Sequence, residues 1–119
     1  MRKKVLVATM LTPLAVIFGP GLFGGADAAP ANCQSGATCG FTGANYTGSY
    51  GNVFGDNSNL TFSPWTGVHS VWNNGNYCND QLFTSTGWTG NSLILGLGDH
   101  VDSLSATYAN NIRSNRWCV

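Results

Sequence analysis

Residues 39–48 read CGFTGANYTG, and residues 81–90 repeat the pattern 42 positions later as QLFTSTGWTG. Each copy has an aromatic residue, a second aromatic after four residues and a glycine two positions further on: Phe41, Tyr46 and Gly48, then Phe83, Trp88 and Gly90. We expect the first aromatic to end a strand, the polar residues to reverse the chain, and the second aromatic to cover the bend. The glycine would supply a dihedral that side chains disfavour. Two copies predict a two-fold repetitive β domain.

The first 28 residues have the three parts of a secretory signal. Basic residues occupy positions 2–4, an apolar run covers positions 5–18, and Ala26-Asp27-Ala28 is a small-residue cleavage site. Prolines and glycines interrupt the apolar stretch too often for a good membrane-spanning helix. We therefore expect cleavage after Ala28, a secreted, extracellular product without a membrane partner, and one domain over residues 29–119.

After cleavage the chain holds two arginines and four aspartates, with no lysine and no glutamate, so its net charge is −2. Such a chain has almost nothing with which to neutralise a phosphate backbone, and we expect no nucleic-acid partner. Two histidines and four carboxylates supply few groups for acid–base or metal chemistry, so we expect no enzyme and no catalytic residue. Twelve aromatic residues spread along the exported chain argue against disorder.

A mature chain of about 90 residues has a small core, which favours a covalent supplement. Four cysteines can supply it: Cys33, Cys39, Cys78 and Cys118. Three pairings are possible. The short spacing of Cys33 and Cys39 favours a small loop before the first strand, which leaves Cys78 to pair with Cys118. A zinc site, the alternative, needs clustered ligand pairs and a reducing compartment.

Between the cysteines the sequence predicts short strands separated by turn residues. The expected strands are residues 37–42, 49–54, 59–62 and 68–72 in the first repeat, and residues 81–84, 92–95 and 103–108 in the second. No window holds an apolar helical period, and at most one short turn is expected, near residues 64–67 or 110–114. The pattern predicts an all-β sandwich of two Greek-key motifs, held by disulfides.

These residues resemble a known fold. The paired hairpins, each followed by a serine in Val68-His69-Ser70-Val71 and Val101-Asp102-Ser103-Leu104, resemble the βγ-crystallin fold. The early cysteine pair and the phrase Ser70-Val71-Trp72-Asn73-Asn74 are similar to the bacterial peptidase inhibitor family of that fold, whose best-known type inhibits secreted metallopeptidases. The resemblance covers residues 33–108. It implies that Ser70 and Ser103 bond to a folded-back hairpin, that of the other repeat, and satisfy its backbone groups.

The resemblance also implies a calcium candidate, because the calcium sites of the fold resemble two Asn or Asp residues, two variable residues, and then Ser or Thr followed by Ser. Asp99, Asp102 and Ser103 supply oxygen ligands of the kind a hard cation needs. His100 and Leu104 replace two of the expected ligands. In the alternative interpretation, Asp99 and Asp102 occupy a solvated turn and the chain needs no cofactor.

An inhibitor needs a projecting loop held stiffly, since rigidity reduces the entropy lost on binding. The segment between the repeats fits this requirement, and its candidate inhibitory residues are Asn74, Gly75, Asn76, Tyr77 and Cys78. Tyr77 presents one large apolar side chain and Cys78 provides an anchor. An ordinary linker between repeats is the alternative.

The resulting hypothesis is a monomeric, secreted inhibitor of an extracellular peptidase, a metallopeptidase by the resemblance, acting by non-covalent occlusion. The alternative is a calcium-binding or cell-wall-carbohydrate-binding module, including an antimicrobial role, in which exposed Trp65 or Trp72 would stack on sugar rings. Phe54 and Phe62 are assigned to the core. We expect at least three of five further aromatics to be buried: Trp65, Trp72, Tyr77, Tyr108 and Trp117.

Overall fold

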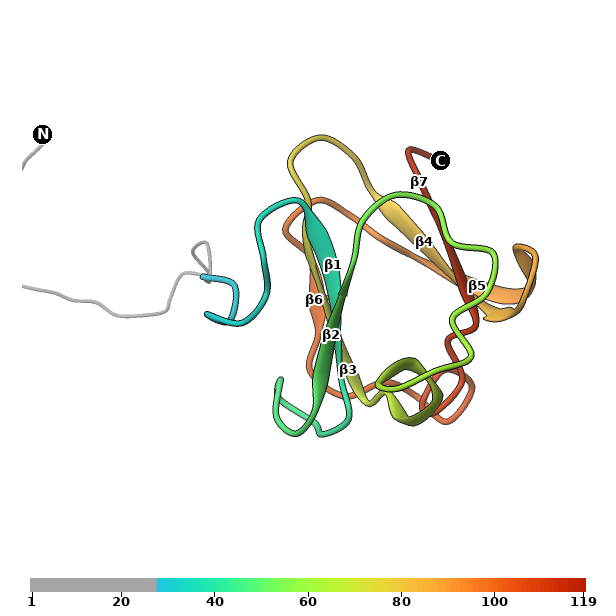
Figure 1. Ribbon diagram of the computed structural model, residues 1–119, viewed down its shortest axis with the longest axis horizontal. Coiled ribbons are helices and arrows are strands. Elements are labelled where there is room, and N and C mark those ends of the chain that lie inside the picture. The colour runs from blue at the N-terminus through green and yellow to red at the C-terminus, as the bar shows by residue number, and fades with distance from the viewer. Residues whose placement is uncertain (1–27) are drawn as a thin grey trace, which may run out of the picture.

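The computed structural model describes residues 28–119, which fold into short strands connected by turns (Figure 1). The elements in chain order are β1 (Ala37–Phe41), β2 (Tyr50–Val53), the 3-10 turn η2 (Trp65–Gly67), β3 (Ser70–Asn74), β4 (Asp80–Ser85), β5 (Thr89–Leu95), β6 (His100–Val101) and β7 (Ser114–Trp117). The predicted secretory signal lies outside the described residues, apart from Ala28. Among residues 28–119, the structure contains no helix with the length and apolarity to cross a bilayer.

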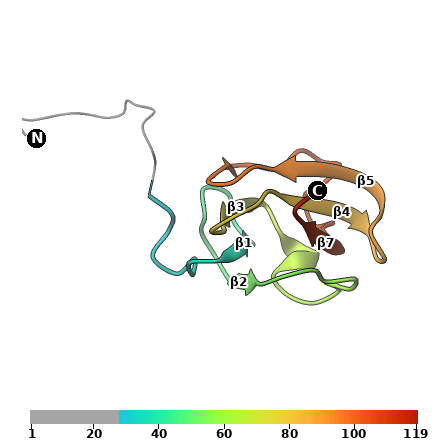
Figure 2. The same ribbon diagram turned by 90° about the horizontal axis from the view of Figure 1, so that it is seen from above.

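The strands form two antiparallel sheets, which Figure 2 shows from above. One sheet has the order β2-β1-β3-β6, and the other has the order β5-β4-β7. Asn57 bridges Asn115, so the segment after β2 lies against the edge strand β7. Each repeat therefore gives its third strand segment to the sheet of the other repeat: β6 pairs with β3, and residue 57 pairs with β7. This exchange confirms the predicted pair of Greek keys in a sandwich.

The main core lies between the two sheets. It contains nine buried apolar residues: Val53, Leu60, Trp65, Val68, Val71, Leu82, Leu95, Leu104 and Ile112. Trp65, at 1% exposure, is the largest of the fully buried side chains. Trp65 lies in η2, the turn that was predicted near residues 64–67. Burial of its indole stabilises this turn.

A second, smaller core lies on the outer face of the first sheet. Alternate residues of β1 point away from the main core, and they pack with the segment that precedes β1. The members of this second core are Cys33, Ala37, Cys39, Phe41 and Trp72, with Ala29 and Tyr46 at its edge. The outer face is thus covered by the N-terminal part of the domain.

Both disulfides form with the connectivity that the cysteine spacing favoured. Cys33 is bonded to Cys39, with Cα atoms 5.6 Å apart, and Cys78 to Cys118, with Cα atoms 4.9 Å apart. No described cysteine is free.

Three expectations about strands were wrong. Residues 59–62 form no strand and residues 103–108 form turns, while the last strand is β7 at Ser114–Trp117. The sequence Ser-Asn-Arg-Trp of β7 has little β propensity and looked like a turn region. Pairing with β4 over four residue pairs and burial of Ser114 and Asn115 hold it in the sheet.

Candidate functional site: the loop between the repeats

Both hairpin corners adopt the predicted backbone. Tyr46 and Trp88 have φ angles of 62° and 60°, and Gly48 and Gly90 have φ angles of 81° and 84°. A Cβ atom on either glycine would clash with the hydroxyl of the threonine that opens its hairpin. Glycine is therefore required twice over, by the left-handed dihedral and by the close contact.

A buried serine closes each corner. The Ser70 Oγ accepts a hydrogen bond from the Tyr46 N–H at 3.0 Å and donates one to a hairpin carbonyl at 2.7 Å. The Ser114 Oγ accepts from the Trp88 N–H at 3.0 Å and donates to a hairpin carbonyl at 2.6 Å. Each serine thereby bonds one backbone N–H and one carbonyl of its corner.

The expectation for Ser103 was wrong, as was the expectation of a bond to the other repeat. Each serine bonds within its own repeat, and Ser114 takes the place given to Ser103. Ser103 lies exposed in the turn after β6. The mistake follows from the missed strand β7, because Ser114 begins that strand as Ser70 begins β3.

The inter-repeat loop, defined as residues 75–79 between β3 and β4, contains the candidate inhibitory side chain. Tyr77 is 90% exposed, the highest value among the exposed large apolar residues of the described chain. A ring in water can bury new apolar surface when a partner binds. The contacts of the loop show how the surrounding backbone is held.

Asn73 braces the loop from inside. This fully buried side chain accepts a hydrogen bond from the Gly75 N–H at 2.8 Å and donates to the carbonyl oxygens of Cys78 at 3.2 Å and Leu95 at 2.9 Å. One amide therefore ties the start and the end of the loop to the end of β5. A Cβ atom on Gly75 would lie 2.6 Å from the Trp117 ring, so the loop start packs directly on that indole.

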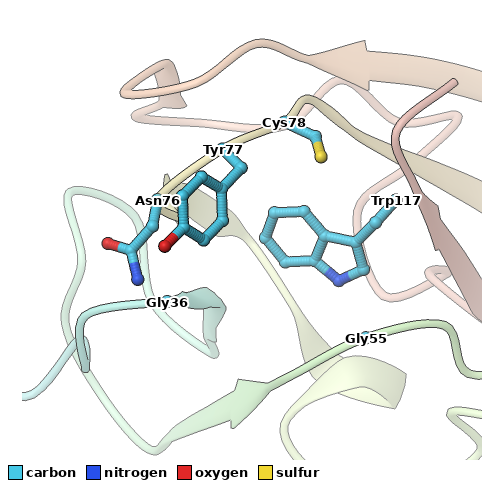
Figure 3. A pocket seen from close by; sticks show the side chains of 6 residues that line it. All are labelled: Gly36, Gly55, Asn76, Tyr77, Cys78 and Trp117. Carbon is cyan, nitrogen blue, oxygen red and sulfur yellow. The ribbon is translucent and has the colours of Figure 1, made fainter.

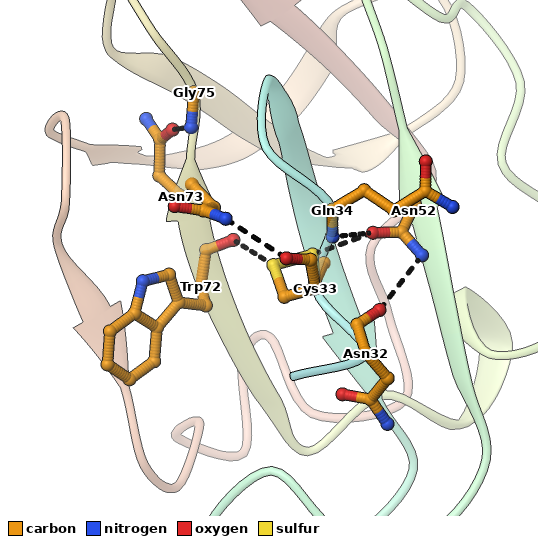
Figure 4. Close-up of a disulfide and its surroundings, with 9 residues drawn as sticks. Asn32, Cys33, Gln34, Asn52, Trp72, Asn73 and Gly75 are labelled. Atoms are coloured by element: carbon orange, nitrogen blue, oxygen red, sulfur yellow. Dashed lines mark hydrogen bonds between the residues drawn. A yellow bond between two sulfur atoms is a disulfide. The ribbon is translucent and has the colours of Figure 1, made fainter. Parts of the chain in front are cut away.

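The two disulfides hold the loop from opposite sides. Cys78 is in the loop itself and is bonded to Cys118 near the chain end. The Cys33–Cys39 segment holds the other side, because the Asn74 amide donates to the Cys33 carbonyl at 3.0 Å and a serine hydroxyl donates to the Asn76 side-chain oxygen at 3.2 Å. Figure 4 shows this disulfide beside β1, with the hydrogen bonds that join its segment to the neighbouring strands. One disulfide thus restrains the five-residue loop directly, and the segment closed by the other contacts it through hydrogen bonds.

A hollow of about 220 Å³ lies beside the loop. Its lining residues come from four separate parts of the chain: Gly36, Gly55, Asn76, Tyr77, Cys78 and Trp117. The Tyr77 and Trp117 rings both face this space (Figure 3). The hollow and the exposed tyrosine form one continuous surface.

A buried carboxyl group begins the strand that follows the loop. Asp80 is fully buried, and its carboxylate oxygens accept hydrogen bonds from the Asn115 amide at 2.9 and 3.2 Å. Burial raises the pKa of Asp80 to about 6, although the hydrogen bond from Asn115 acts in the opposite direction. This carboxyl group faces the interior and takes no part in the loop surface.

The predicted calcium ligands Asp99 and Asp102 take part in separate hydrogen bonds in the described structure. Asp99 accepts a hydrogen bond from the Gly96 N–H at 3.2 Å, whereas Asp102 is bonded to the hydroxyl of Tyr46 and contacts His100 at 3.3 Å. The hydrogen bond from Tyr46 lowers the pKa of Asp102. Within residues 28–119 no three His, Cys, Asp or Glu side chains are arranged to hold a metal ion. Calcium binding stays a prediction, testable as a rise in melting temperature in millimolar calcium.

The burial of the aromatic residues differs from the expectation. Trp65 and Trp72 are 1% and 4% exposed, so neither can stack on a sugar ring from outside. Phe54 and Phe62, which were expected in the core, are 54% and 53% exposed. Among the five further aromatics only these two tryptophans are buried, whereas Tyr108 and Trp117 are half-buried and Tyr77 is exposed. The expectation of at least three buried rings was therefore wrong.

The fold and the loop define a small βγ-crystallin-like domain with one protruding, doubly anchored loop. It is similar to a βγ-crystallin domain solved in work on the evolution of the eye lens fold (TM-score 0.66, 19% identity, 77% of this chain and 94% of that chain). It is also similar to a βγ-crystallin from Ciona intestinalis (TM-score 0.59, 16% identity, 70% and 100% of the two chains) and to IPSE/alpha-1 from Schistosoma mansoni eggs (0.59, 22%, 72% and 88%). At these identities the likeness concerns the fold alone.

The model of peptidase inhibitor family I36 matches residues 26–95. The chain therefore belongs to peptidase inhibitor family I36. The match ends at the last residue of β5 and includes the whole inter-repeat loop. No curated protein matches the sequence.

Sequence reasoning identified the loop and missed its two main supports. Asn73 was not among the candidate loop residues, although its position directly before Asn74 and Gly75 is typical of an Asx-type side-chain bond to the backbone two residues on. Trp117 gave no local signal. It reaches the loop only because β7 pairs with β4 and places Trp117 opposite Asp80.

Proposed function

We propose that this protein inhibits an extracellular peptidase by placing the inter-repeat loop in the substrate cleft, where it blocks access without forming a covalent bond. Family membership supports a peptidase as the partner. The observation that carries the assignment of the loop is its restraint by the Cys78–Cys118 disulfide and by Asn73, with Tyr77 left 90% exposed.

The physical reason is preorganisation. A flexible peptide loses conformational entropy when a peptidase binds it, whereas a loop already fixed loses little and gains affinity by that difference. The hydrogen bonds of Asn73 and the disulfide at Cys78 are all within the inhibitor, so they persist in the complex. The proposed target is a secreted metallopeptidase, as in the best-known members of the family.

The test titrates purified protein against a thermolysin-like metallopeptidase and a subtilisin-like serine peptidase. We expect at least one enzyme to lose activity at micromolar or lower inhibitor concentration. Non-covalent occlusion further predicts that activity returns on dilution and that the mass of the denatured peptidase is unchanged. Full activity of both enzymes at micromolar protein would contradict the proposal, and a mass increase of the denatured enzyme would contradict the mechanism alone.

A further inference from the structure

Two exposed aromatic rings lie beside the same hollow. Tyr77 lines it directly. Phe54 precedes the lining residue Gly55, and its Cε1 atom is 4.0 Å from the place a Cβ on Gly36 would occupy. With Tyr77 at 90% and Phe54 at 54% exposure, this edge of the domain presents two apolar rings to water, and the Trp117 indole lines the same hollow.

The loop part of this surface carries no charged side chain. Residues 74–79 contain no ionisable acid or base apart from the tyrosine hydroxyl. Arg116 adjoins Trp117 in sequence but points to the opposite face of the sheet, where its guanidinium lies 4.5 Å from the centre of the Trp88 ring. The Asp56 carboxylate lies beside Trp117, because its Oδ1 accepts a hydrogen bond from the Trp117 N–H at 2.8 Å. The loop thus offers an apolar ring and no cation.

We infer that Tyr77 is the specificity-determining residue of the inhibitory loop, and that the target is a peptidase with an uncharged, aromatic-accepting specificity pocket. This inference rests on the proposed function and adds the chemistry of the partner. The Tyr77 ring enters the pocket, while Phe54 and the hollow receive the apolar rim of the cleft beside it.

Physical reasons favour this partner over others. Burying a large ring that was fully exposed gives the greatest hydrophobic gain available on the loop, and aromatic side chains at the centre of an interface commonly dominate affinity. A pocket with a carboxylate at its base, which selects Lys or Arg, would keep that charge buried without a partner when Tyr77 entered. Tyr77 therefore favours a peptidase with an aromatic-selective pocket and disfavours one that selects Lys or Arg.

The experiment measures inhibition constants of the parent and five variants against three peptidases. One peptidase has an aromatic-selective pocket before the cleaved bond, one is a metallopeptidase with an apolar pocket after it, and one selects Lys or Arg. We expect Tyr77→Ala to weaken inhibition of the responsive enzyme by about 100-fold and Phe54→Ala by about 10-fold. Tyr77→Phe keeps the ring and should stay within about 3-fold of the parent. Tyr77→Arg should lose inhibition of that enzyme and gain inhibition of the Lys/Arg-selective one.

Tyr50→Ala is the matched control, because Tyr50 is also an exposed tyrosine, at 51%, but pairs with Phe41 at the end of the sheet opposite the loop. It should leave inhibition unchanged. Since Tyr77 is almost fully exposed, its variants should keep the parent melting temperature, which separates loss of contact from loss of fold. If the parent inhibits an enzyme and Tyr77→Ala inhibits it equally well, the inference is overturned and the proposed function stands. A parent protein that inhibits none of the three overturns both.

Discussion

The two repeats share one hairpin corner and differ in what covers it. In the first repeat, the Tyr46 ring lies edge-on to Phe41 and Trp72, with ring centroids 5.6 and 5.0 Å away, and Trp72 stacks on His100 at 4.0 Å. In the second repeat, the Trp88 indole donates to the Asn115 carbonyl at 2.8 Å and lies under Arg116. The corner depends on the backbone and one serine, so the side chains around it can change.

The outer faces of the two sheets also differ in what covers them. The Cys33–Cys39 segment covers the face of the first sheet, whereas Ile94 of the second sheet is 58% exposed. The first disulfide stays within one repeat, and the second joins the inter-repeat loop to the chain end. One duplicated framework thus supports a closed side and an open side, and the loop lies where the two repeats meet.

Removing each disulfide should show the largest difference between the two sides. Changing Cys78 and Cys118 together to Ala should lower the free energy of unfolding by about 4 kcal/mol, because that bond closes the longer loop of the unfolded chain. The same change at Cys33 and Cys39 should cost about 2.5 kcal/mol. Urea unfolding of both double variants measures this order. A larger loss from the first disulfide would mean that its packing in the second core outweighs loop entropy.

The two corner serines should be equivalent. Ser70→Ala and Ser114→Ala each remove two hydrogen bonds to the corner backbone, which should lower the free energy of unfolding by about 2 kcal/mol. Ser103→Ala is the control and should change stability by less than about 0.5 kcal/mol, since Ser103 is exposed. Chemical denaturation of the three variants compares them directly. A costly Ser103→Ala change beside a neutral Ser114→Ala change would refute the equivalence of the repeats.

The smallest expected effect concerns a buried position at which the two repeats carry different side chains. Thr38 lies three residues before the corner phenylalanine of the first repeat, and Asp80 lies three residues before that of the second. Because the folded-state pKa of Asp80, about 6, is above the ordinary value of 3.8, its contribution to stability is fully present below the ordinary pKa and is lost as pH rises through the folded one. From pH 5 to pH 8 this loss should be about 1.4 kcal/mol.

Asp80→Asn removes the titrating group while keeping a side-chain oxygen for the Asn115 amide. Its stability, followed by thermal unfolding in the same pH range, should vary less than that of the parent. Asp102 does not interfere, because its pKa is lowered and its contribution changes only as pH falls into the acid range. An unchanged pH slope in the Asp80→Asn variant would show that the buried carboxyl group is not its source.

Much of the fold could be read from the sequence because its main signals are local. The spacing of Phe41, Tyr46 and Gly48 encodes a bend within eight residues, and the copy at Phe83 repeats it. The short separation of Cys33 and Cys39 favoured the observed disulfides. The loop itself was also found, since turn residues, one tyrosine and a cysteine occur together there.

The remaining features depend on residues brought together across the two sheets. Ser114, rather than Ser103, closes the second corner because β7 pairs with β4, a contact with no local signal. The exposure of Phe54 was missed for the same reason, because the alternation of residues along a strand does not show which edge of a sandwich stays uncovered.

By itself the sequence determined the doubled corner, the sandwich and the position of the loop, because dihedral preference and short-range spacing act within a few residues. Only the tertiary structure decided which groups make the loop rigid and which ring it presents. Asn73 and Trp117 restrain the loop only after β3 and β7 have taken their places in opposite sheets. Pairing between strands that are far apart in the sequence fixes those places. A local sequence pattern does not show which distant segments will come into contact.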